Sequence, residues 1–329
     1  MQITLEGHPQ PVAVQAGDTV LESLLRAGLA FPFSCQAGNC GTCKCELVSG
    51  DVHELEYSEH ALSAAERARG IVLACRTQVW DDTVIRRIDA EELVVHPSRV
   101  MRCRVLEAAD LTHDIKGLRL AIESGGPFTF SAGQYAQVEL GPGLSRHYSM
   151  ASTPDEPELA FHVRHMPGGR TSSYVATQLK AGDRVKVSGP LGIAYLREAH
   201  RGPVLLVAGG SGLAPIRSIL CTLLERGHDA PVTLYFGVRS ERDLYHETLL
   251  RDLAAKQPNF SYHVVLSEQK GARGRRYGLV HEVIALPEIE NLMAYLAGPP
   301  VMVEAATAML AARGLARRQI HADAFYNQD

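Results

Sequence analysis

The chain has 329 residues, of which 46% are hydrophobic and 21% charged, and its formal net charge at pH 7 is −4. This length predicts two or three domains, and the composition is typical of a soluble globular protein, which excludes disordered and fibrous classes. No apolar run is long enough to cross a membrane, the N-terminus lacks the pattern of a secretory signal, and we expect neither a membrane nor a nucleic-acid partner.

The first segment of the chain predicts a small mixed α and β domain. Alternating apolar residues indicate strands at 3–5 and 12–14. Thr19 and Glu22 have the spacing of a capping box, and the helix that they open carries apolar side chains at 20, 21, 24 and 25 and ends near Gly28. Further strands are predicted at 45–48 and 71–74. These elements suit a β-grasp domain over residues 1–92, with its last strand ending near Ile88 and residues 89–98 as a linker.

Four cysteines in this segment follow the spacing C-x4-C-x2-C…C: Cys35, Cys40, Cys43 and Cys75. This is the plant-type ferredoxin spacing, in which four thiolates hold a 2Fe–2S cluster that carries one electron at a time. Gly38 and Gly41 allow the loop a positive φ and a close approach to the sulfides. A structural zinc site is the alternative, but such sites usually pair two Cys-x2-Cys knuckles and this sequence has one.

The cysteine content as a whole bears on the compartment. Seven cysteines in a chain of this size, four of them in a ligand pattern, favour a reducing cytosol, so we expect a cytoplasmic protein. We expect the three remaining cysteines to be small buried hydrophobes: Cys45, Cys103 and Cys221.

The charges are distributed unevenly along the chain. Residues 1–92 carry 14 acidic and 7 basic side chains, whereas the remainder carries 23 acidic and 26 basic ones. An acidic lobe attached to a mildly basic body can steer the encounter with a basic partner surface, or it can be an ordinary solvated surface.

Residues 99–198 predict an antiparallel β-barrel. Short alternating stretches occur at 101–106, 117–121, 134–139, 159–164 and 184–188, and glycine and proline separate them. One short helix is predicted at 171–179.

Two segments of this barrel are candidates for flavin binding. In the segment RHYSMAS (146–152), Arg146 can pair with a pyrophosphate, Tyr148 can stack on an isoalloxazine ring and Ser149 can hydrogen-bond the nitrogen edge of that ring. The segment PGGRTSS (167–173) is a glycine turn that opens a helix, and its free amides suit a phosphate group. Its candidate binding residues are Gly169, Thr171 and Ser172.

From residue 199 to 329 the pattern predicts strands alternating with helices, and therefore a parallel sheet with βαβ crossovers. Strands are expected at 204–208, 232–238, 262–266, 292–296 and 320–325, with a helix at 213–225. The turn after the first strand permits the close approach of a dinucleotide phosphate through Gly209, Gly210, Ser211, Gly212 and Pro215. Gly298 and Pro299 form a second tight turn at the same carboxyl edge.

Taken together, these motifs resemble the ferredoxin–NAD(P)H reductase superfamily. The whole chain is most similar to the flavin reductases of Rieske-type aromatic-ring oxygenases that carry an N-terminal plant-type ferredoxin, of the naphthalene-dioxygenase type. The resemblance implies FAD rather than FMN, with Ser152 closing the R-x-Y-S-x-x-S flavin motif. It also implies that the aromatic Phe325, near the end of the last strand, covers the flavin. Tyr148, Ser149 and Phe325 are then the candidate catalytic residues.

Two departures from the family pattern concern the nucleotide. Many members have a cysteine before the Gly-Pro turn, but Ala297 stands here, so no thiol role in hydride transfer carries over. After the second parallel strand, Arg239 and Arg242 can serve a 2′-phosphate, whereas Glu241 or Asp243 would oppose it. We therefore expect NADH, with NADPH possible.

The resemblance implies that electrons pass from NADH to FAD, from FAD to the 2Fe–2S cluster, and on to a Rieske oxygenase or its Rieske ferredoxin. A reductase of a soluble diiron monooxygenase is an alternative within the same class. A redox-sensing or passive electron-carrier protein is an alternative from another class, which the intact flavin and nucleotide segments disfavour.

Overall fold

The computed structural model describes residues 1–29, 31–33, 36–39, 41–59, 61–88, 94, 96–286 and 289–326. The chain divides into two compact units, Met1–Val95 with Tyr326–Asp329, and His96–Phe325. None of the helices among these described residues has the length and the apolar character needed to span a membrane.

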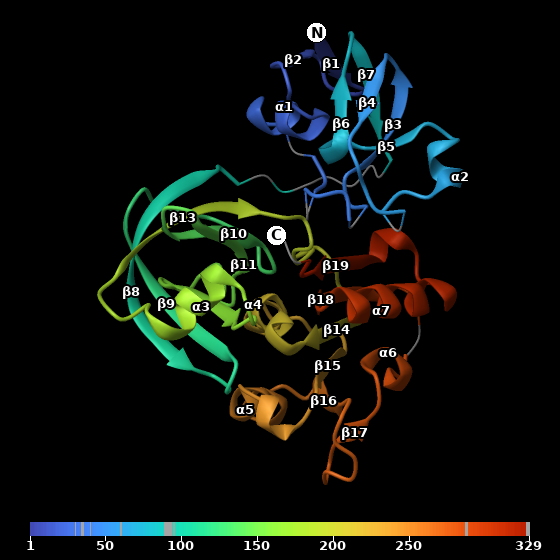
Figure 1. Cartoon of the computed structure of the whole chain (residues 1–329). Helices are drawn as coiled ribbons and strands as arrows, with labels where there is room; N and C mark the ends of the chain where they lie inside the picture. Colours follow the sequence, from blue (N-terminus) through green and yellow to red (C-terminus); the bar gives the residue numbers. More distant parts are fainter. Residues whose placement is uncertain are drawn as a thin grey trace. The chain divides into compact units, whose positions relative to one another are not determined.

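The first unit is built on a mixed five-stranded sheet with strand order β2-β1-β7-β3-β5, in which β1 and β7 are parallel (Figure 1). A second pair, β4 with β6, lies beside it. The strands are β1 (Gln2–Leu5), β2 (Val12–Ala13), β3 (Lys44–Ser49), β4 (Val52–Glu54), β5 (Ile71–Leu73), β6 (Thr77–Val79) and β7 (Thr83–Arg87). The helical segments in the described part of this unit are α1 (Val20–Arg26), α2 (Ala64–Arg67) and the 3-10 helix η1 (Ala74–Arg76). This is the predicted β-grasp arrangement.

Local signals explain where the helices of this unit begin. The predicted capping box at α1 is present, because Thr19 accepts a hydrogen bond from the Glu22 amide and Glu22 returns one to the Thr19 amide. The buried side chains Val20, Leu21 and Leu24 anchor the helix to the sheet. The helix α2 was not predicted from the sequence, although Ser63 and Glu66 form a second capping box of the same kind.

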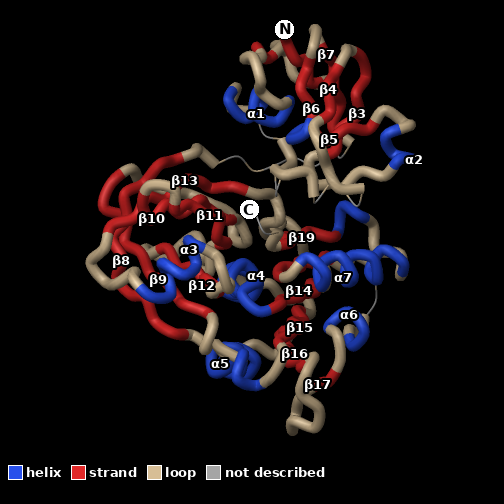
Figure 2. The backbone as a smooth tube through the Cα atoms, viewed as in Figure 1, coloured by secondary structure: helices blue, strands red, loops and turns tan. Residues whose placement is uncertain are grey.

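The first part of the second unit is a six-stranded antiparallel sheet with order β11-β10-β13-β8-β9-β12. Its strands are β8 (Arg99–Asp110), β9 (Ile115–Ser124), β10 (Tyr135–Gly141), β11 (Leu144–Ser149), β12 (Leu159–Arg164) and β13 (Arg184–Leu191). Figure 2 shows these strands curving around a common core. A bridge between Met150 and Phe161 joins the two outer strands. The predicted antiparallel barrel is therefore present, with the helix α3 (Arg170–Thr177) packed against β11 and β12.

The rest of the second unit is a parallel sheet with order β17-β16-β15-β14-β18-β19. Its strands are β14 (Val204–Gly209), β15 (Val232–Val238), β16 (Phe260–Leu266), β17 (Arg276–Tyr277), β18 (Met293–Gly298) and β19 (Ile320–Ala324). Its longer helices are α4 (Leu213–Glu225), α5 (Glu247–Lys256), α6 (Val280–Val283) and α7 (Pro300–Ala312), and its 3-10 helices are η2 (Gly210–Gly212), η3 (Glu241–Asp243) and η4 (Arg317–Gln319).

Each face of this sheet is covered by its own apolar cluster. Leu206 and Ala208 of β14 pack with Ile216 of α4 on one face. Leu205 and Val207 pack with α6 and α7 on the other face. Because β14 lies between β15 and β18, the strand order reverses at β14, and the crevice at the carboxyl ends of β14 and β18 is where such sheets bind ligands.

Candidate functional site

The cysteine loop of the first unit brings two of the four predicted ligands together. The Cys43 and Cys75 sulfurs lie 3.2 Å apart, and both side chains are buried. The Ala74 amide donates a hydrogen bond to the Cys43 carbonyl and so fixes η1 beside the loop. This separation lets both thiolates reach one tetrahedral iron, so the two residues fit a cluster site. Cys35 and Cys40 lie outside the described residues.

The two glycines of this loop have the conformation that the sequence predicts. Gly38 has φ +74° and Gly41 has φ +68°. A Cβ on Gly41 would lie 2.7 Å from the Ala61 carbonyl oxygen, so only glycine fits there without a shift of the backbone. The prediction that Cys45, Cys103 and Cys221 are buried hydrophobes is also confirmed. Burial, with the nearby Cys75, raises the pKa of Cys45 to about 12, which keeps it a thiol.

The flavin candidates in the second unit lie on β11 and at the start of α3, which pack against each other. Tyr148 is half-buried, and burial raises the pKa of its hydroxyl to about 12, whereas Arg146 is exposed. Gly169 is the N-cap of α3 and supplies no side-chain cap. The amide donors of the first turn are therefore left for an anion, which fits a flavin pyrophosphate.

Ser149 makes a contact that no local sequence pattern indicates. Its hydroxyl donates a hydrogen bond of 2.9 Å to the carboxylate of Asp323 in β19, and both side chains are buried. Burial raises the pKa of Asp323 to about 6, although the bond from Ser149 acts in the opposite direction. This pair can hold a proton at the position where the flavin ring nitrogens are expected.

The other hydroxyls of the flavin segments hold the local backbone. Ser152 is fully buried, and its hydroxyl accepts a hydrogen bond from the Ala160 amide. The Ser172 hydroxyl accepts one from the Met166 amide, while Thr171 is buried beside it. Ser152 and Ser172 thus fix the shape of the two segments, and their direct contact with FAD stays a prediction.

The two predicted glycine turns meet at the switch point of the parallel sheet. A Cβ on Gly212 would lie 2.1 Å from the Ala297 carbonyl oxygen, and a Cβ on Gly298 would lie 2.7 Å from the Gly209 carbonyl oxygen. Glycine is therefore required at both turns by their close approach. Gly210, with φ +53°, and Ser211 lie in the same turn, and Pro215 is buried in the first turn of α4.

Phe325 lies beside the second of these glycine turns. Its amide donates a hydrogen bond of 3.0 Å to the Gly298 carbonyl, and its side chain is half-buried. Since Pro299 follows Gly298 as the N-cap of α7, the end of β19 is fixed against the second turn. Asp323 and Phe325 therefore connect the flavin strand to the nucleotide turn.

The Arg239 guanidinium is paired with two carboxylates, although its side chain is 41% exposed. The guanidinium lies 3.1 Å from Asp114 of the β8–β9 turn and 2.8 Å from Asp243. Arg164 also pairs with Asp114, at 3.0 Å. The hydrogen bond from Arg239 to Asp243 raises the pKa of Arg239, so the guanidinium stays charged and paired.

Three family models match the chain in consecutive ranges. The 2Fe-2S iron-sulfur cluster binding domain matches residues 3–79, the oxidoreductase FAD-binding domain residues 102–195, and the oxidoreductase NAD-binding domain residues 206–308. The fold, the paired cysteines and the two glycine turns thus define an NAD(P)H-dependent reductase that uses FAD and a 2Fe–2S cluster.

Known proteins of this kind are similar to the chain over its whole length. The reductase component of the naphthalene 1,2-dioxygenase/salicylate 5-hydroxylase systems of a Ralstonia species is 41% identical over 99% of each chain. The corresponding component of the naphthalene 1,2-dioxygenase system of Pseudomonas putida is 39% identical, again over 99% of each. The solved structure of an Amycolatopsis cytochrome P450 reductase is 38% identical, covers 98% of each chain and gives a TM-score of 0.82.

The chain belongs to the family of FAD/2Fe–2S reductase components of aromatic oxygenase systems. The predicted fold class, cofactors and reductase function are thereby confirmed: such proteins pass electrons from NAD(P)H through FAD and a 2Fe–2S cluster to an oxygenase.

Several residues of the site belong to no motif and could not be predicted from the sequence. Asp323 is one acidic residue on a strand, 174 positions from Ser149. Arg217 and Ser218 of α4 donate hydrogen bonds to the carbonyls of Ala151 and Ser152, which joins the flavin segment to the nucleotide sheet. Only the fold brings these residues together, because each bond spans more than sixty positions of sequence.

Proposed function

We propose that this protein takes electrons from NADH and delivers them to a Rieske-type aromatic-ring oxygenase or to its small Rieske ferredoxin. The support for this acceptor is the similarity to two naphthalene 1,2-dioxygenase reductase components over 99% of each chain. The support for NADH is Arg239, whose pairing with Asp114 and Asp243 leaves its charge satisfied without a 2′-phosphate.

In this proposal the second unit holds both FAD and the nucleotide. Arg146 and the amides of Thr171 and Ser172 bind the FAD pyrophosphate, and Gly169, whose amide donates to the Met166 carbonyl, forms the turn that opens α3. Tyr148 stacks on the ring, with Ser152 closing the motif. The nucleotide lies against the turn Gly209, Gly210, Ser211, Gly212 and Pro215 and against Gly298 and Pro299. Arg239 borders the adenosine ribose.

One observation carries the hydride route: β19 contacts both proposed binding sites. Asp323 binds Ser149 of the flavin strand, and Phe325 binds Gly298 of the nucleotide turn. Asp323 lies in β19 and Phe325 directly follows it, and two residues at this separation are about 7 Å apart along an extended chain. A nicotinamide at Gly298 can therefore lie within contact distance of a flavin at Ser149.

The chain's own residues then control the reaction. When bound, FAD would accept one hydride, and with it two electrons, and would release these electrons one at a time, which is chemistry that the protein itself cannot supply. Ser149 and Asp323 hold a proton beside the flavin edge, and Phe325 covers the ring until nicotinamide displaces it. Cys35, Cys40, Cys43 and Cys75 hold the 2Fe–2S cluster, from which electrons leave the protein.

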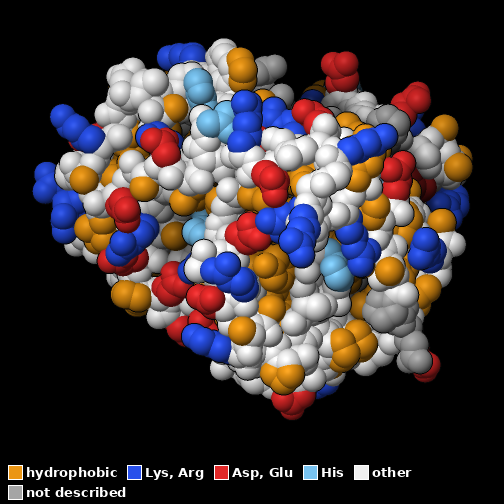
Figure 3. Space-filling view, turned by 90° about the horizontal axis from the view of Figure 1, so that it is seen from below, with side chains coloured by type: hydrophobic (Ala, Val, Ile, Leu, Met, Phe, Trp, Pro, Cys, Tyr) orange, Lys and Arg blue, Asp and Glu red, His pale blue; other side chains and the backbone are white. Residues whose placement is uncertain are grey.

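The acidic lobe suggests where the acceptor docks. Arg26, Lys44, Arg67 and Arg86 each pair with a carboxylate of the first unit. Glu56 and Glu59 are exposed, and they flank Ser58, whose amide donates a hydrogen bond to the Gly38 carbonyl of the cysteine loop. On the face seen in Figure 3, by contrast, charges of both signs are interspersed. We place the acceptor at the cysteine loop.

The same proposal assigns three domains, residues 1–92 for the cluster, 99–198 for FAD and 199–329 for NAD(P)H, in a cytoplasmic protein. The family-model ranges 3–79, 102–195 and 206–308 support this division, since each falls within one of the proposed domains.

A cytochrome P450 acceptor is the second candidate, because the Amycolatopsis reductase superposes with a TM-score of 0.82. The test is NADH-driven reduction of purified acceptors: a Rieske ferredoxin, a Rieske oxygenase, a bacterial P450 and a diiron monooxygenase. We expect the Rieske components to be reduced at least tenfold faster than the others. If the P450 or the diiron protein is reduced faster than the Rieske components, the proposed acceptor is wrong.

A further inference from the structure

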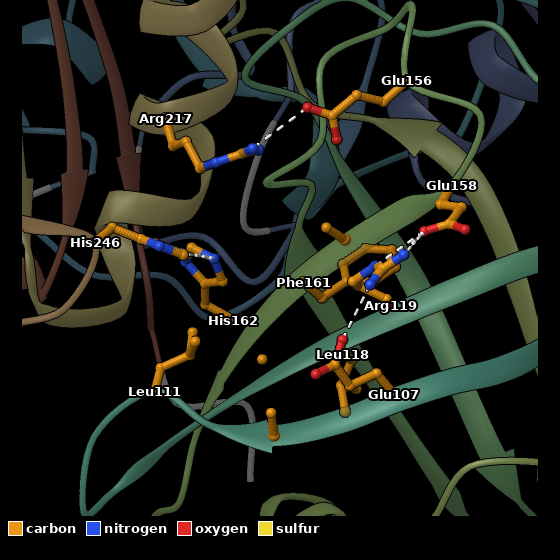
Figure 4. A pocket seen from close by; sticks show the side chains of 13 residues that line it. Glu107, Leu111, Leu118, Arg119, Glu156, Glu158, Phe161, His162, Arg217 and His246 are labelled. Atoms are coloured by element: carbon orange, nitrogen blue, oxygen red, sulfur yellow. Dashed lines mark hydrogen bonds and ion pairs between the residues drawn. The ribbon is translucent and has the colours of Figure 1, made fainter. Parts of the chain in front are cut away.

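A pocket of about 320 Å³ in the second unit is lined by Arg217, but by none of the residues that we assign to binding FAD, the nucleotide or the cluster (Figure 4). Strands β8, β9 and β12 form one side, and Arg217 of α4 and His246, which precedes α5, form the other. Ion pairs hold its charged side chains: Arg119 with Glu107 and Glu158, and Arg217 with Glu156. Three carboxylates against two guanidinium groups make the lining mildly negative.

Two histidines from distant parts of the chain meet in this pocket. The Nε2 atoms of His162 in β12 and His246 lie 3.3 Å apart, and Figure 4 shows the two rings directed toward each other. His246 has φ +56°, a left-handed backbone that costs free energy in a residue other than glycine. Burial lowers the pKa of His162 well below its usual range and that of His246 to about 4, so both rings are neutral at pH 7.

The hydrogen bonds behind His162 fix its tautomer. The Tyr245 hydroxyl donates its one proton to the Gly210 carbonyl, at 3.1 Å. His162 Nδ1 lies 3.2 Å from the same hydroxyl oxygen and must therefore be the donor to it. The His162 Nε2 lone pair is consequently directed at His246. An imidazole that donates its other N–H to a fixed partner is the arrangement that protein metal sites use.

The distances between the two rings match the spacing of a shared metal ion. Two imidazole nitrogens on one tetrahedral zinc ion stand roughly 3.3–3.4 Å apart, and the ring centroids about 5.2 Å apart, because each Zn–N bond is about 2.0–2.1 Å. The observed values are 3.3 Å and 5.1 Å. A head-on N–H···N hydrogen bond of the same length would separate the centroids by about 5.6 Å.

We propose that His162 and His246 form a binding site for a divalent transition-metal ion of the zinc type, with water in the pocket completing its coordination. The neighbouring Arg217 opposes a cation, since its charge lowers the pKa of both histidines, but its ion pair with Glu156 offsets part of that charge. A bound ion joins β12 of the barrel to the segment before α5. Through Tyr245 and Gly210 it also stiffens the turn that we assign to the nucleotide.

The experiment uses the untagged holoprotein and two probes. In calorimetric titration with Zn²⁺, we expect one equivalent to bind to the wild type and to the control His281→Asn, and the same step to be lost in His246→Asn. Asparagine tolerates the left-handed backbone, so His246→Asn removes the ligand atom without adding strain. Excess Zn²⁺ should raise the melting temperature of the second unit by about 2–5 °C in the wild type and in His281→Asn, but not in His246→Asn.

Electron paramagnetic resonance with Cu²⁺ identifies the ligands, because oxidised FAD and an oxidised 2Fe–2S cluster give no signal. The spectrum should show splitting from two nitrogens in the wild type and in His281→Asn, and lose it in His246→Asn and in His162→Gln. If His162→Gln does not fold, His246→Asn alone decides. Identical Zn²⁺ titrations of the wild type and His246→Asn would overturn the proposal.

Discussion

The Ser149 hydroxyl donates a 2.9 Å hydrogen bond to Asp323, and this contact joins the flavin strand β11 to the last strand of the nucleotide sheet. Asp323 is buried there with Ser149 as its partner, and burial raises its pKa to about 6. The contact therefore has a measurable consequence for stability as well as for catalysis.

Asp323→Asn should become more stable than the wild type as the pH rises. A free aspartate has a pKa of about 3.9, so between pH 4 and pH 6 the folded protein binds more protons than the unfolded chain and loses stability as pH increases. Above pH 6 the buried carboxylate costs on the order of 2–3 kcal/mol, which the asparagine avoids. Melting temperatures of both proteins from pH 4.5 to pH 8 test this. Asp252→Asn, at an exposed position, is the control. If the difference in melting temperature from the wild type does not change with pH for either variant, the prediction is wrong.

Cys75→Ser should lose the visible absorption of the 2Fe–2S cluster while the protein keeps its FAD. NADH-driven reduction of ferricyanide should continue at nearly the wild-type rate, since it needs only the second unit, whereas reduction of the oxygenase partner should fall by more than 100-fold. The neighbouring buried Cys45→Ala is the control and should keep the cluster. Full reduction of the oxygenase by Cys75→Ser would mean that electrons leave from the flavin.

Reversing one charge beside the cysteine loop should slow reduction of the acceptor. Glu59→Lys is compared with Asp51→Lys, the same charge change at the other end of β3, about 20 Å along the strand. At low ionic strength we expect Glu59→Lys to reduce the acceptor three- to tenfold more slowly than the wild type, and Asp51→Lys to reduce it at nearly the wild-type rate. The difference should shrink above about 0.1 M salt, where screening becomes short-ranged. Equal rates for the two variants would show that the acidic residues of the first unit are an ordinary solvated surface and do not dock the acceptor.

Asp114→Asn should increase the use of NADPH. Asp114 and Asp243 together neutralise Arg239, and removing one carboxylate leaves the guanidinium with charge to offer a 2′-phosphate. We expect the KM for NADPH to fall about tenfold and the KM for NADH to change less than twofold. Steady-state ferricyanide reduction measures both. An unchanged KM for NADPH would show that Arg239 does not face the adenosine ribose.

The sequence predicted those parts of the molecule whose signals are local. The Thr19–Glu22 capping box, the apolar run of β14 and the glycine turns all depend on neighbouring residues, and the structure contains each of them. The pairing of Asp323 with Ser149 and of His162 with His246 could not be predicted, because it depends on how distant strands and helices pack. The capping box of α2, formed by Ser63 and Glu66, is a local signal from which this helix could also have been predicted.

Phe325→Ala should bind NAD⁺ more tightly than the wild type. The Phe325 amide is fixed to Gly298, so its half-buried ring is held at the nucleotide edge, two residues beyond Asp323. A ring that covers the flavin competes with nicotinamide, and removing it favours the stacked complex. We expect at least fivefold tighter binding, a stronger flavin–nicotinamide charge-transfer band, and slower turnover because NAD⁺ leaves late.

The same variant separates this gate from a ring that only packs in the core. Removing a fully buried Phe ring typically costs about 3–5 kcal/mol of stability and leaves nucleotide affinity unchanged. Because the Phe325 side chain is only half-buried, a gate predicts a much smaller loss of stability together with the gain in affinity. Phe325→Leu, which keeps apolar bulk but not the flat ring, should restore stability without restoring the wild-type NAD⁺ affinity. A large fall in melting temperature with unchanged affinity would assign Phe325 to the core.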